Sequence, residues 1–306
     1  MSVRELVVLG TASQVPTRAR AHHGAFVRFD DAGLLLDPGE GTQRQMILAG
    51  VTASQVTGIF LTHAHGDHCL GLPGVVQRCS LDGVTRTLPI HFPTAAAPFV
   101  ERLTQATSFE PVTPIELRPT DPDGAPTPGH GPVQVRSASL SHVIPTIGWR
   151  FTEPDGRRMR PELAGAAGVH GADRARLVAD GRVRIAGRTV HLDEVSEPRP
   201  GQSVAFVMDT RACEGATDLA ADVDLLIIEA TFLETERELA DESGHLTAAG
   251  AARIGREAGA RRVVLTHFSQ RYPDLDGHLE EARLAAPGLD LVIARDLARI
   301  PLPERR

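Results

Sequence analysis

A dense run of potential metal ligands, Thr-His-Ala-His-Gly-Asp-His at residues 62–68, constrains this chain more than any other feature. It contains His63, His65, Asp67 and His68 and follows directly on a short apolar segment. Imidazole nitrogens and carboxylate oxygens are ligands that suit zinc. A tight turn can direct two of the histidines at one ion and the other two side chains at a neighbour. Two ions about 3.5–4 Å apart can clamp both oxygens of a displacement at phosphorus. The segment therefore predicts a binuclear metal site.

A binuclear site needs more ligands than this segment offers, and other polar residues follow strand-like segments in the same way. Polar residues at strand ends tend to collect at one edge of a sheet. The candidates of this kind are His142, Asp209 and His267. Seven histidines lack that context and are expected to be surface or structural residues: His22, His23, His91, His130, His170, His191 and His278.

Short apolar segments alternate with helix-like stretches, which predicts one mixed α/β domain spanning residues 1–306. The expected strands are 5–9, 25–29, 34–36, 58–61, 133–140, 146–151, 203–208, 224–228, 262–265 and 289–293. The expected helices are 41–49, 70–79, 96–106, 232–241, 247–258 and 277–286.

Residues 154–200 lack a clean period and carry proline and glycine at both ends, which predicts an insertion between two sheet strands. Within it, residues 156–192 hold eight arginines and three acidic residues, a surplus of positive charge in a chain whose net charge is −7. The negative total argues against a general nucleic-acid binder. The positive charge of this segment leaves two interpretations open. The insertion is either a solvent-exposed surface segment without a partner or an arm that binds a partner.

Composition argues against a membrane protein and against a secreted protein. No apolar run approaches the roughly 20 residues that span a bilayer, so we expect no membrane segment. The first ten residues carry one positive charge and lead straight into a strand, which is not typical of a signal peptide. Three cysteines, without a CxxC pair, suit a reducing compartment. We therefore expect a cytoplasmic protein.

Several further motifs share an order and spacing with one known family. The run HAHGDH matches the HxHxDH signature of the metallo-β-lactamase superfamily, and the whole set resembles ribonuclease Z, the tRNA 3′-processing endonuclease. The matching stretches are LGTASQVPTRAR (9–20), DPGEGTQRQM (37–46), FLTHAHGDHCLGLPGVVQR (60–78), SHVIPTIGWR (141–150), FVMDTR (206–211), IEATF (228–232), GHLTAAGAA (244–252) and LTHFSQRY (265–272).

The resemblance implies an αββα sandwich with a protruding basic arm at 154–200 and two zinc ions per subunit, with manganese or iron as possible replacements. Asp209 would bridge the two ions. One ion would be held by His63, His65 and His142, and the other by Asp67, His68 and His267.

The resemblance also implies the reaction, which is metal-dependent hydrolysis of a phosphodiester bond in precursor tRNA. A water between the ions would be the nucleophile, with Asp67 orienting it or accepting its proton. His245, paired with Glu229, would be the general acid for the leaving 3′-oxygen. The products would be a tRNA with a 3′-hydroxyl and a trailer with a 5′-phosphate.

Substrate contacts follow from the same resemblance. The basic arm would grip the body of the tRNA through Arg174 and Arg176, because arginine–phosphate contacts give affinity without reading sequence. Arg18 and Arg20 lie in the loop that matches the family's PxKxRN motif. The family also works as a homodimer in which the arm of one subunit serves the active site of the other.

The chain departs from the family pattern at several places. Ile228 replaces the first histidine of the HEAT motif, Ala21 replaces the asparagine of PxKxRN, and Leu246 replaces the serine of HST. The arm also lacks the expected Gly-Pro tract near 168–175. These changes motivate an alternative, a metallo-phosphodiesterase of the same fold that acts on a smaller substrate. A third reading is a non-catalytic RNA-binding protein, against which the complete ligand set argues.

Overall fold

The computed structural model describes residues 3–122, 127–130 and 133–305. The chain divides into two compact units. The first unit comprises Met1–Thr152 and Ser203–Pro303, and the second comprises Glu153–Gln202 and Glu304–Arg306. The predicted insertion at 154–200 falls within the second unit.

Two sheets make up the first unit, and each has seven strands among the described residues. The first sheet runs, in spatial order, β18 (Arg299–Pro301), β1 (Arg4–Gly10), β2 (Gly24–Phe29), β3 (Ala32–Leu36), β4 (Gly58–Phe60), β5 (Leu88–Pro93) and β6 (Ile115–Thr120). The second runs β17 (Asp290–Ile293), β16 (Arg262–Thr266), β15 (Leu225–Glu229), β14 (Ser203–Val207), β9 (Thr146–Thr152), β8 (Val133–Leu140) and β7 (Thr127–His130).

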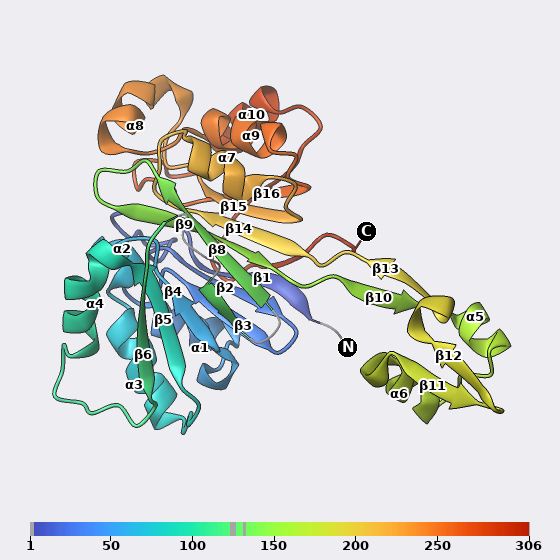
Figure 1. The fold of residues 1–306 in the computed structure, drawn as a ribbon. Coiled ribbons are helices and arrows are strands. Elements are labelled where there is room, and N and C mark those ends of the chain that lie inside the picture. Colours follow the sequence, from blue (N-terminus) through green and yellow to red (C-terminus); the bar gives the residue numbers. More distant parts are fainter. Residues whose placement is uncertain (1–2, 123–126, 131–132, 306) are drawn as a thin grey trace. The chain divides into compact units, whose positions relative to one another are not determined.

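Helices cover the outer side of both sheets, as Figure 1 shows for the first unit, with α1, α3 and α4 beside one sheet and α7, α9 and α10 beside the other. The α-helices of this unit are α1 (Thr42–Ala49), α2 (Gly66–Cys69), α3 (Leu72–Leu81), α4 (Ala97–Thr104), α7 (Glu214–Ala220), α8 (Arg237–Ser243), α9 (Ala248–Glu257) and α10 (Asp276–Ala285). Short 3-10 helices are η1 (Ala53–Gln55), η2 (Thr94–Ala96) and η4 (Glu234–Glu236). The expected αββα sandwich is confirmed.

Side chains that alternate along a strand fill two different layers of core. In β1, Leu6 and Val8 belong to the cluster between the two sheets, whereas Val7 and Leu9 pack toward the helices of the first sheet. Successive side chains of a strand point to opposite faces, so a strand covered on both sides reads as a continuous apolar run. Trp149, from the other sheet, spans the space between them and donates its indole N–H to the Leu61 carbonyl at 3.2 Å.

The parallel part of the second sheet places several polar residues at one edge. Strands β14 to β17 pair in parallel, so their C-terminal ends lie on the same side. Glu229 pairs with Thr266 in this register. Asp209 and His267 follow the ends of β14 and β16, and they therefore lie at the same edge as Glu229.

The second unit has its own small core. Its strands form two antiparallel pairs, β10 (Gly156–Met159) with β13 (Ser196–Arg199) and β11 (Arg182–Ile185) with β12 (Arg188–His191). Its helices are α5 (Pro161–Ala166), α6 (Ala172–Asp180) and the 3-10 turn η3 (Leu192–Val195). The buried residues are Ala164, Val169, Leu177, Val190 and Val195.

Some elements of the first unit differ from the sequence expectation. The sequence does not predict β5 and β6, because both carry prolines, which normally argue against a sheet interior. The expected helix at 232–241 begins later: η4 comes first, and α8 spans Arg237–Ser243. The helix begins later because Phe232 forms an isolated β-bridge with Thr247 and the backbone of Leu233 is extended.

Candidate metal centre and active site

Three residues that follow strands near the ligand run adopt a left-handed backbone conformation, which is uncommon for side-chain-bearing residues and occurs elsewhere in the described structure at Asp30 and Asp222, among others. Asp37 follows β3 with φ of 42°, Asp209 follows β14 with φ of 50°, and His267 follows β16 with φ of 62°. Left-handed backbone costs free energy for non-glycine residues and tends to persist at functional sites. These turns direct all three side chains into one buried region at the edge of the two sheets.

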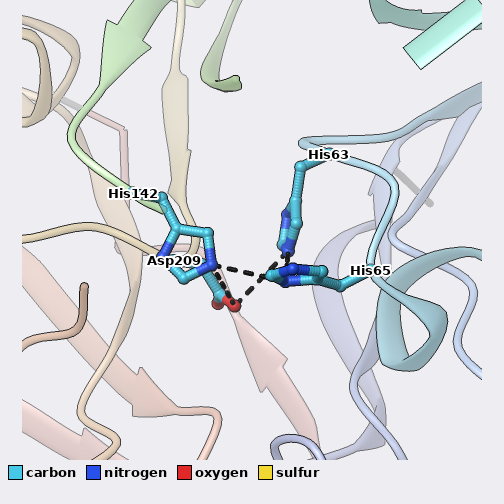
Figure 2. A group of neighbouring side chains, drawn as sticks. All are labelled: His63, His65, His142 and Asp209. Atoms are coloured by element: carbon cyan, nitrogen blue, oxygen red, sulfur yellow. Dashed lines mark hydrogen bonds and ion pairs between the residues drawn. The ribbon is translucent and has the colours of Figure 1, made fainter. Parts of the chain in front are cut away.

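The first group of candidate ligands comes from three separate elements (Figure 2). His63 and His65 lie in the loop after β4, His142 follows β8, and Asp209 follows β14. Nδ1 of His65 lies 3.0 Å from Nε2 of His63 and 3.3 Å from Nε2 of His142. Oδ2 of Asp209 lies 3.5 Å from the same nitrogen of His63. The four ligand atoms could hold one ion.

A second group lies directly beside the first. It consists of Asp67 and His68 on α2 and His267 after β16. Nε2 of His68 lies 3.1 Å from Nε2 of His267, and Oδ2 of Asp67 lies 3.4 Å from both nitrogens. Asp209 connects the groups, because its Oδ2 is 3.3 Å from His68 and its Oδ1 is 3.4 Å from His267.

The chemistry of this donor set fits divalent metal ions. Five imidazoles and two carboxylates converge with ring nitrogens facing each other, an arrangement that hydrogen bonds alone cannot satisfy. Oδ1 of Asp209 is buried and has no hydrogen-bond partner among the described residues. A buried carboxylate oxygen without a donor is costly, and a cation would satisfy it. Nitrogen and carboxylate ligands of this kind are typical of zinc.

The pKa shifts of several candidate ligands favour metal binding as well. Burial lowers the pKa of His63 well below its usual range, with neighbouring His68 adding to the effect. Burial lowers the pKa of His142 in the same way. Burial alone would raise the pKa of Asp209, but His267 and His68 outweigh it and hold this pKa well below its usual range. Neutral imidazoles and an ionised carboxylate are the forms that bind a metal. His68 is the exception: burial would lower its pKa, but the carboxylates of Asp209 and Asp67 outweigh burial and raise it well above its usual range.

Hydrogen bonds behind the ligands fix their rings. The ring N–H at Nδ1 of His68 donates to Oδ2 of Asp37 at 2.8 Å, and the Thr62 hydroxyl donates to the same oxygen at 2.6 Å. The Thr62 amide donates to the other oxygen at 2.7 Å. Nδ1 of His142 donates to the Gly244 carbonyl at 2.8 Å. Such partners set the tautomer of a metal-binding histidine and orient its ring.

Glycine permits the loop that carries Asp37 to approach the ligand helix. A Cβ atom on Gly39 would lie 2.1 Å from the carbonyl oxygen of Asp67. A side chain there would push the loop away from α2, so the DPGEG motif needs glycine at this position.

His245 and Glu229 form a hydrogen-bonded pair next to the ligands. Nδ1 of His245 donates to Oε1 of Glu229 at 3.0 Å, and Glu229 is fully buried. Burial would lower the pKa of His245, but the Glu229 carboxylate outweighs it and raises the pKa to about 9. The Thr210 amide donates to Oε1 at 2.7 Å and the Leu246 amide to Oε2 at 3.1 Å, so the carboxylate is held rigidly.

A pocket of about 650 Å³ opens onto this region. Its wall includes the candidate ligands His65, Asp67 and Asp209 together with His245. Apolar and basic side chains also line it, namely Leu70, Val143, Phe232, Leu239 and Arg271, together with the polar residues Ser13, Gln14, Ser243, Ser269 and Gln270. The pocket therefore gives a substrate access to both the ligands and the His245–Glu229 pair.

The four arginines expected to bind substrate differ in exposure: three are exposed and one is buried. Arg18 is exposed in the loop before β2. Arg20 is buried, and one of its terminal nitrogens donates to the carbonyls of Ser269 and Tyr272 at 3.0 Å each. These bonds tie the two loops together. Arg174 and Arg176 are exposed on α6 in the second unit.

Sequence reasoning missed some residues of the site. Asp37 ends an apolar strand, so the same criterion that selected Asp209 would have found it. His23, expected to be a surface or structural residue, is buried with its ring centroid 5.7 Å from His68 and 5.6 Å from His267. Burial lowers the pKa of His23 well below its usual range. The side chain of His130 lies outside the described part of the structure.

Comparison with known proteins places the chain in a family. The model of the metallo-beta-lactamase superfamily matches residues 18–144, and that of a beta-lactamase superfamily domain matches residues 185–268. Among solved structures, the short form of human tRNase Z has a TM-score of 0.71 at 24% identity and covers 98% of this chain and 100% of its own. This likeness supports the fold.

Relatives of known name match along the whole length. The ribonuclease Z of Streptomyces coelicolor is 52% identical over 308 residues, and that of Nocardia farcinica is 52% identical over 306 residues. Both comparisons cover 100% of this chain and 100% of the relative. With this identity over the full length, and with the superfamily fold around a His/Asp cluster, the chain belongs to the ribonuclease Z family of the metallo-β-lactamase superfamily.

Proposed function

We propose that the side chains gathered at the sheet edge hold two zinc ions and cleave precursor tRNA at the 3′ end of its mature sequence. Membership of the ribonuclease Z family makes the chain a metal-dependent endoribonuclease of tRNA 3′ processing.

The first ion would be held by His63, His65 and His142, and the second by Asp67, His68 and His267. Asp209 would bridge them, which would give its unpartnered buried Oδ1 a cation. When bound, the ions supply Lewis-acid chemistry, which stabilises negative charge on the phosphoryl oxygens and makes water a usable nucleophile near neutral pH. The observation that carries this proposal is the position of Asp209 between two complete groups of ligands.

The residues around the ions would manage the protons. Asp67 lines the pocket with one oxygen near His68 and His267, which suits a group that orients the attacking water. As the water oxygen bonds to phosphorus, the bond between phosphorus and the ribose 3′-oxygen breaks. His245, kept protonated by Glu229, would deliver a proton to that 3′-oxygen. The tRNA keeps a 3′-hydroxyl, and the trailer keeps the 5′-phosphate.

The second unit would bind the body of the tRNA. Its helix α6 presents Arg174 and Arg176 to solvent, and exposed arginines suit contacts with phosphates. Arg174 also donates to the Val169 carbonyl at 3.3 Å, and Arg176 lies 3.7 Å from Asp173. Arg18 and Arg20 would contribute from the loop before β2, Arg18 by direct contact and Arg20 by holding the loop in place.

We propose a homodimer that acts in the cytoplasm, as the resemblance to the family implies. All three cysteines, Cys69, Cys79 and Cys213, are free, which supports a reducing compartment. None of the described helices is long and apolar enough to cross a membrane.

The direct test is cleavage of a precursor tRNA with a 3′ trailer by zinc-loaded protein, with the cut site mapped. We expect one cut immediately after the discriminator base, and no cut with Asp67→Ala. If the protein leaves the precursor intact but hydrolyses a small diester such as bis(p-nitrophenyl) phosphate, the substrate is a smaller phosphodiester and the tRNA assignment fails. Metal content measured by mass spectrometry of the native protein tests the two zinc ions separately.

A further inference from the structure

The hydroxyl of Thr231 lies between two parts of the site that have separate tasks. Thr231 follows the end of β15 and is buried. Its Oγ1 lies 2.6 Å from Oε2 of Glu229 and 3.0 Å from Nδ1 of His267. Glu229 belongs to the proton-donating pair, and His267 belongs to the ligands of the second ion. Thr231 is thus in contact with both.

The directions of these hydrogen bonds follow from the number of protons available. A hydroxyl has one proton to donate and two lone pairs that accept. The Glu229 carboxylate is the closer acceptor and carries a charge, so it takes the proton in preference to the His267 carbonyl at 2.9 Å. Oγ1 then accepts from the ring N–H at Nδ1 of His267.

This arrangement fixes the tautomer of His267. With the proton on Nδ1, the Nε2 atom keeps its lone pair. That nitrogen is the one that faces Asp67 at 3.4 Å and His68 at 3.1 Å. The ligand atom of His267 is therefore prepared by the same hydroxyl that holds Glu229.

Glu229 depends on this hydroxyl as well. Its Oε1 accepts from the Thr210 amide and from His245, whereas Oε2 accepts from Thr231 and, over a longer 3.1 Å, from the Leu246 amide. Without the hydroxyl, Oε2 would lose its shortest bond. The carboxylate could then turn, and His245 would move with it.

We propose that Thr231 is a positioning residue that couples the metal centre to the proton donor. It acts through His267 on metal retention and through Glu229 and His245 on departure of the 3′-oxygen. This inference rests on the proposed function, since it assumes that His267 is a ligand and His245 the donor.

Two substrates separate the two effects. Precursor tRNA has a poor leaving group that needs a proton, whereas bis(p-nitrophenyl) phosphate releases a stable phenolate that does not. Zinc retention is measured independently of turnover, by competition with a chromogenic chelator. For Thr231→Val we expect zinc affinity to fall about 10–100-fold. At saturating zinc, single-turnover cleavage of precursor tRNA should fall about tenfold or more, while diester hydrolysis stays near the wild-type rate.

The chain offers a matched control one strand away. Thr266 is buried, pairs with Glu229 in the sheet, and has a hydroxyl without any hydrogen-bond partner among the described residues. Thr266→Val makes the same chemical change next to His267 and should alter neither zinc affinity nor cleavage. Thr231→Ser keeps the hydroxyl and should restore both properties.

The following outcomes would contradict the proposal that Thr231 couples the metal centre to the proton donor. Unchanged zinc affinity in Thr231→Val would remove the link to His267, and equal losses on both substrates would remove the link to the donor. A Thr231→Ser variant as impaired as Thr231→Val would show that the hydroxyl is not responsible. If Thr231→Val does not fold, Thr231→Ala, which adds no methyl group against the carboxylate, takes its place. Failure of the wild-type protein to cut tRNA would overturn the proposed substrate, while zinc affinity of the variants would still decide the role of Thr231.

Discussion

Oδ2 of Asp37 lies 2.8 Å from Nδ1 of His68, and both side chains are fully buried. The carboxylate also accepts bonds from the Thr62 amide and hydroxyl, so it has three donor groups from two residues. It thereby leaves the lone pair on Nε2 of His68 available to the proposed metal ion and anchors the loop that carries the candidate ligands.

Replacing Asp37 by asparagine should weaken zinc binding with little change in shape. The amide must turn an N–H toward either Thr62 or His68, each of which already donates, so one buried donor loses its acceptor. We expect zinc affinity to fall about 10–100-fold in a chelator competition assay. Asp31→Asn, at an exposed position, is the matched control and should bind zinc as the wild type does. Full zinc affinity in Asp37→Asn would mean that His68 is oriented by other contacts.

The pair of His245 and Glu229 should act as one unit in cleavage. His245→Ala should leave the zinc content intact and slow single-turnover cleavage of precursor tRNA about 10²–10⁴-fold, the range for a lost general acid. Glu229→Gln should also slow cleavage, because the carboxylate that keeps His245 protonated is lost. The double variant should be little slower than His245→Ala alone, since groups that serve one step are not additive. Loss of zinc from His245→Ala would instead identify His245 as a ligand, since its ring also lies near Asp209 and His267.

His278 should make the stability of the fold depend on pH. It is buried on α10, and burial, with Arg20 adding to the effect, lowers the pKa of His278 to about 4. The unfolded chain binds a proton near pH 6.5, so stability is complete above that pH and declines as the pH falls toward 4. The full effect corresponds to about 3 kcal/mol.

Urea unfolding of metal-free protein between pH 4.5 and 7.5 measures this dependence without the contribution of zinc release. The His278→Gln variant should show a flatter profile than the wild type. His170→Gln is the control, because His170 is exposed on the second unit and its replacement should not change the profile. Identical slopes for wild type and His278→Gln would show that other groups cause the acid sensitivity.

Much of the candidate site could be predicted because most of its histidine and aspartate residues directly follow apolar strands. The ligand run at 62–68 and the single polar residues Asp209 and His267 stand out against apolar strands, and parallel pairing brings such positions to one edge. The positions of β5 and β6 could not be predicted in the same way. Both strands contain proline, and their place in the sheet is decided by tertiary pairing with neighbours, not by local preference.

Residues that act through others were harder to recognise. Thr231 and Thr62 are common residue types whose roles depend on which acceptor or donor lies opposite, and the sequence does not give that partner. Arg20 illustrates the reverse case, because a charged residue in a loop suggests a surface contact. Its guanidinium group is instead buried against backbone carbonyls of the 269–272 loop. Long-range packing decides such assignments.

The second unit should bind precursor tRNA through the exposed arginines of α6. Replacing both Arg174 and Arg176 by glutamate should raise KM for precursor tRNA and leave hydrolysis of bis(p-nitrophenyl) phosphate unchanged, because the small diester has no phosphates besides the one that is cleaved. Both side chains are exposed and the buried Leu177 that follows them on the helix is retained, so the fold of the unit should survive. If each arginine binds a phosphate, the slope of log affinity against log salt should fall by about one for each phosphate that is no longer bound. Arg102→Glu combined with Arg283→Glu, at exposed positions of α4 and α10 in the first unit, makes the same change in net charge and serves as the control. Equal losses on both substrates would show that α6 supports folding or assembly, and an unchanged KM for tRNA would exclude these two arginines from binding it.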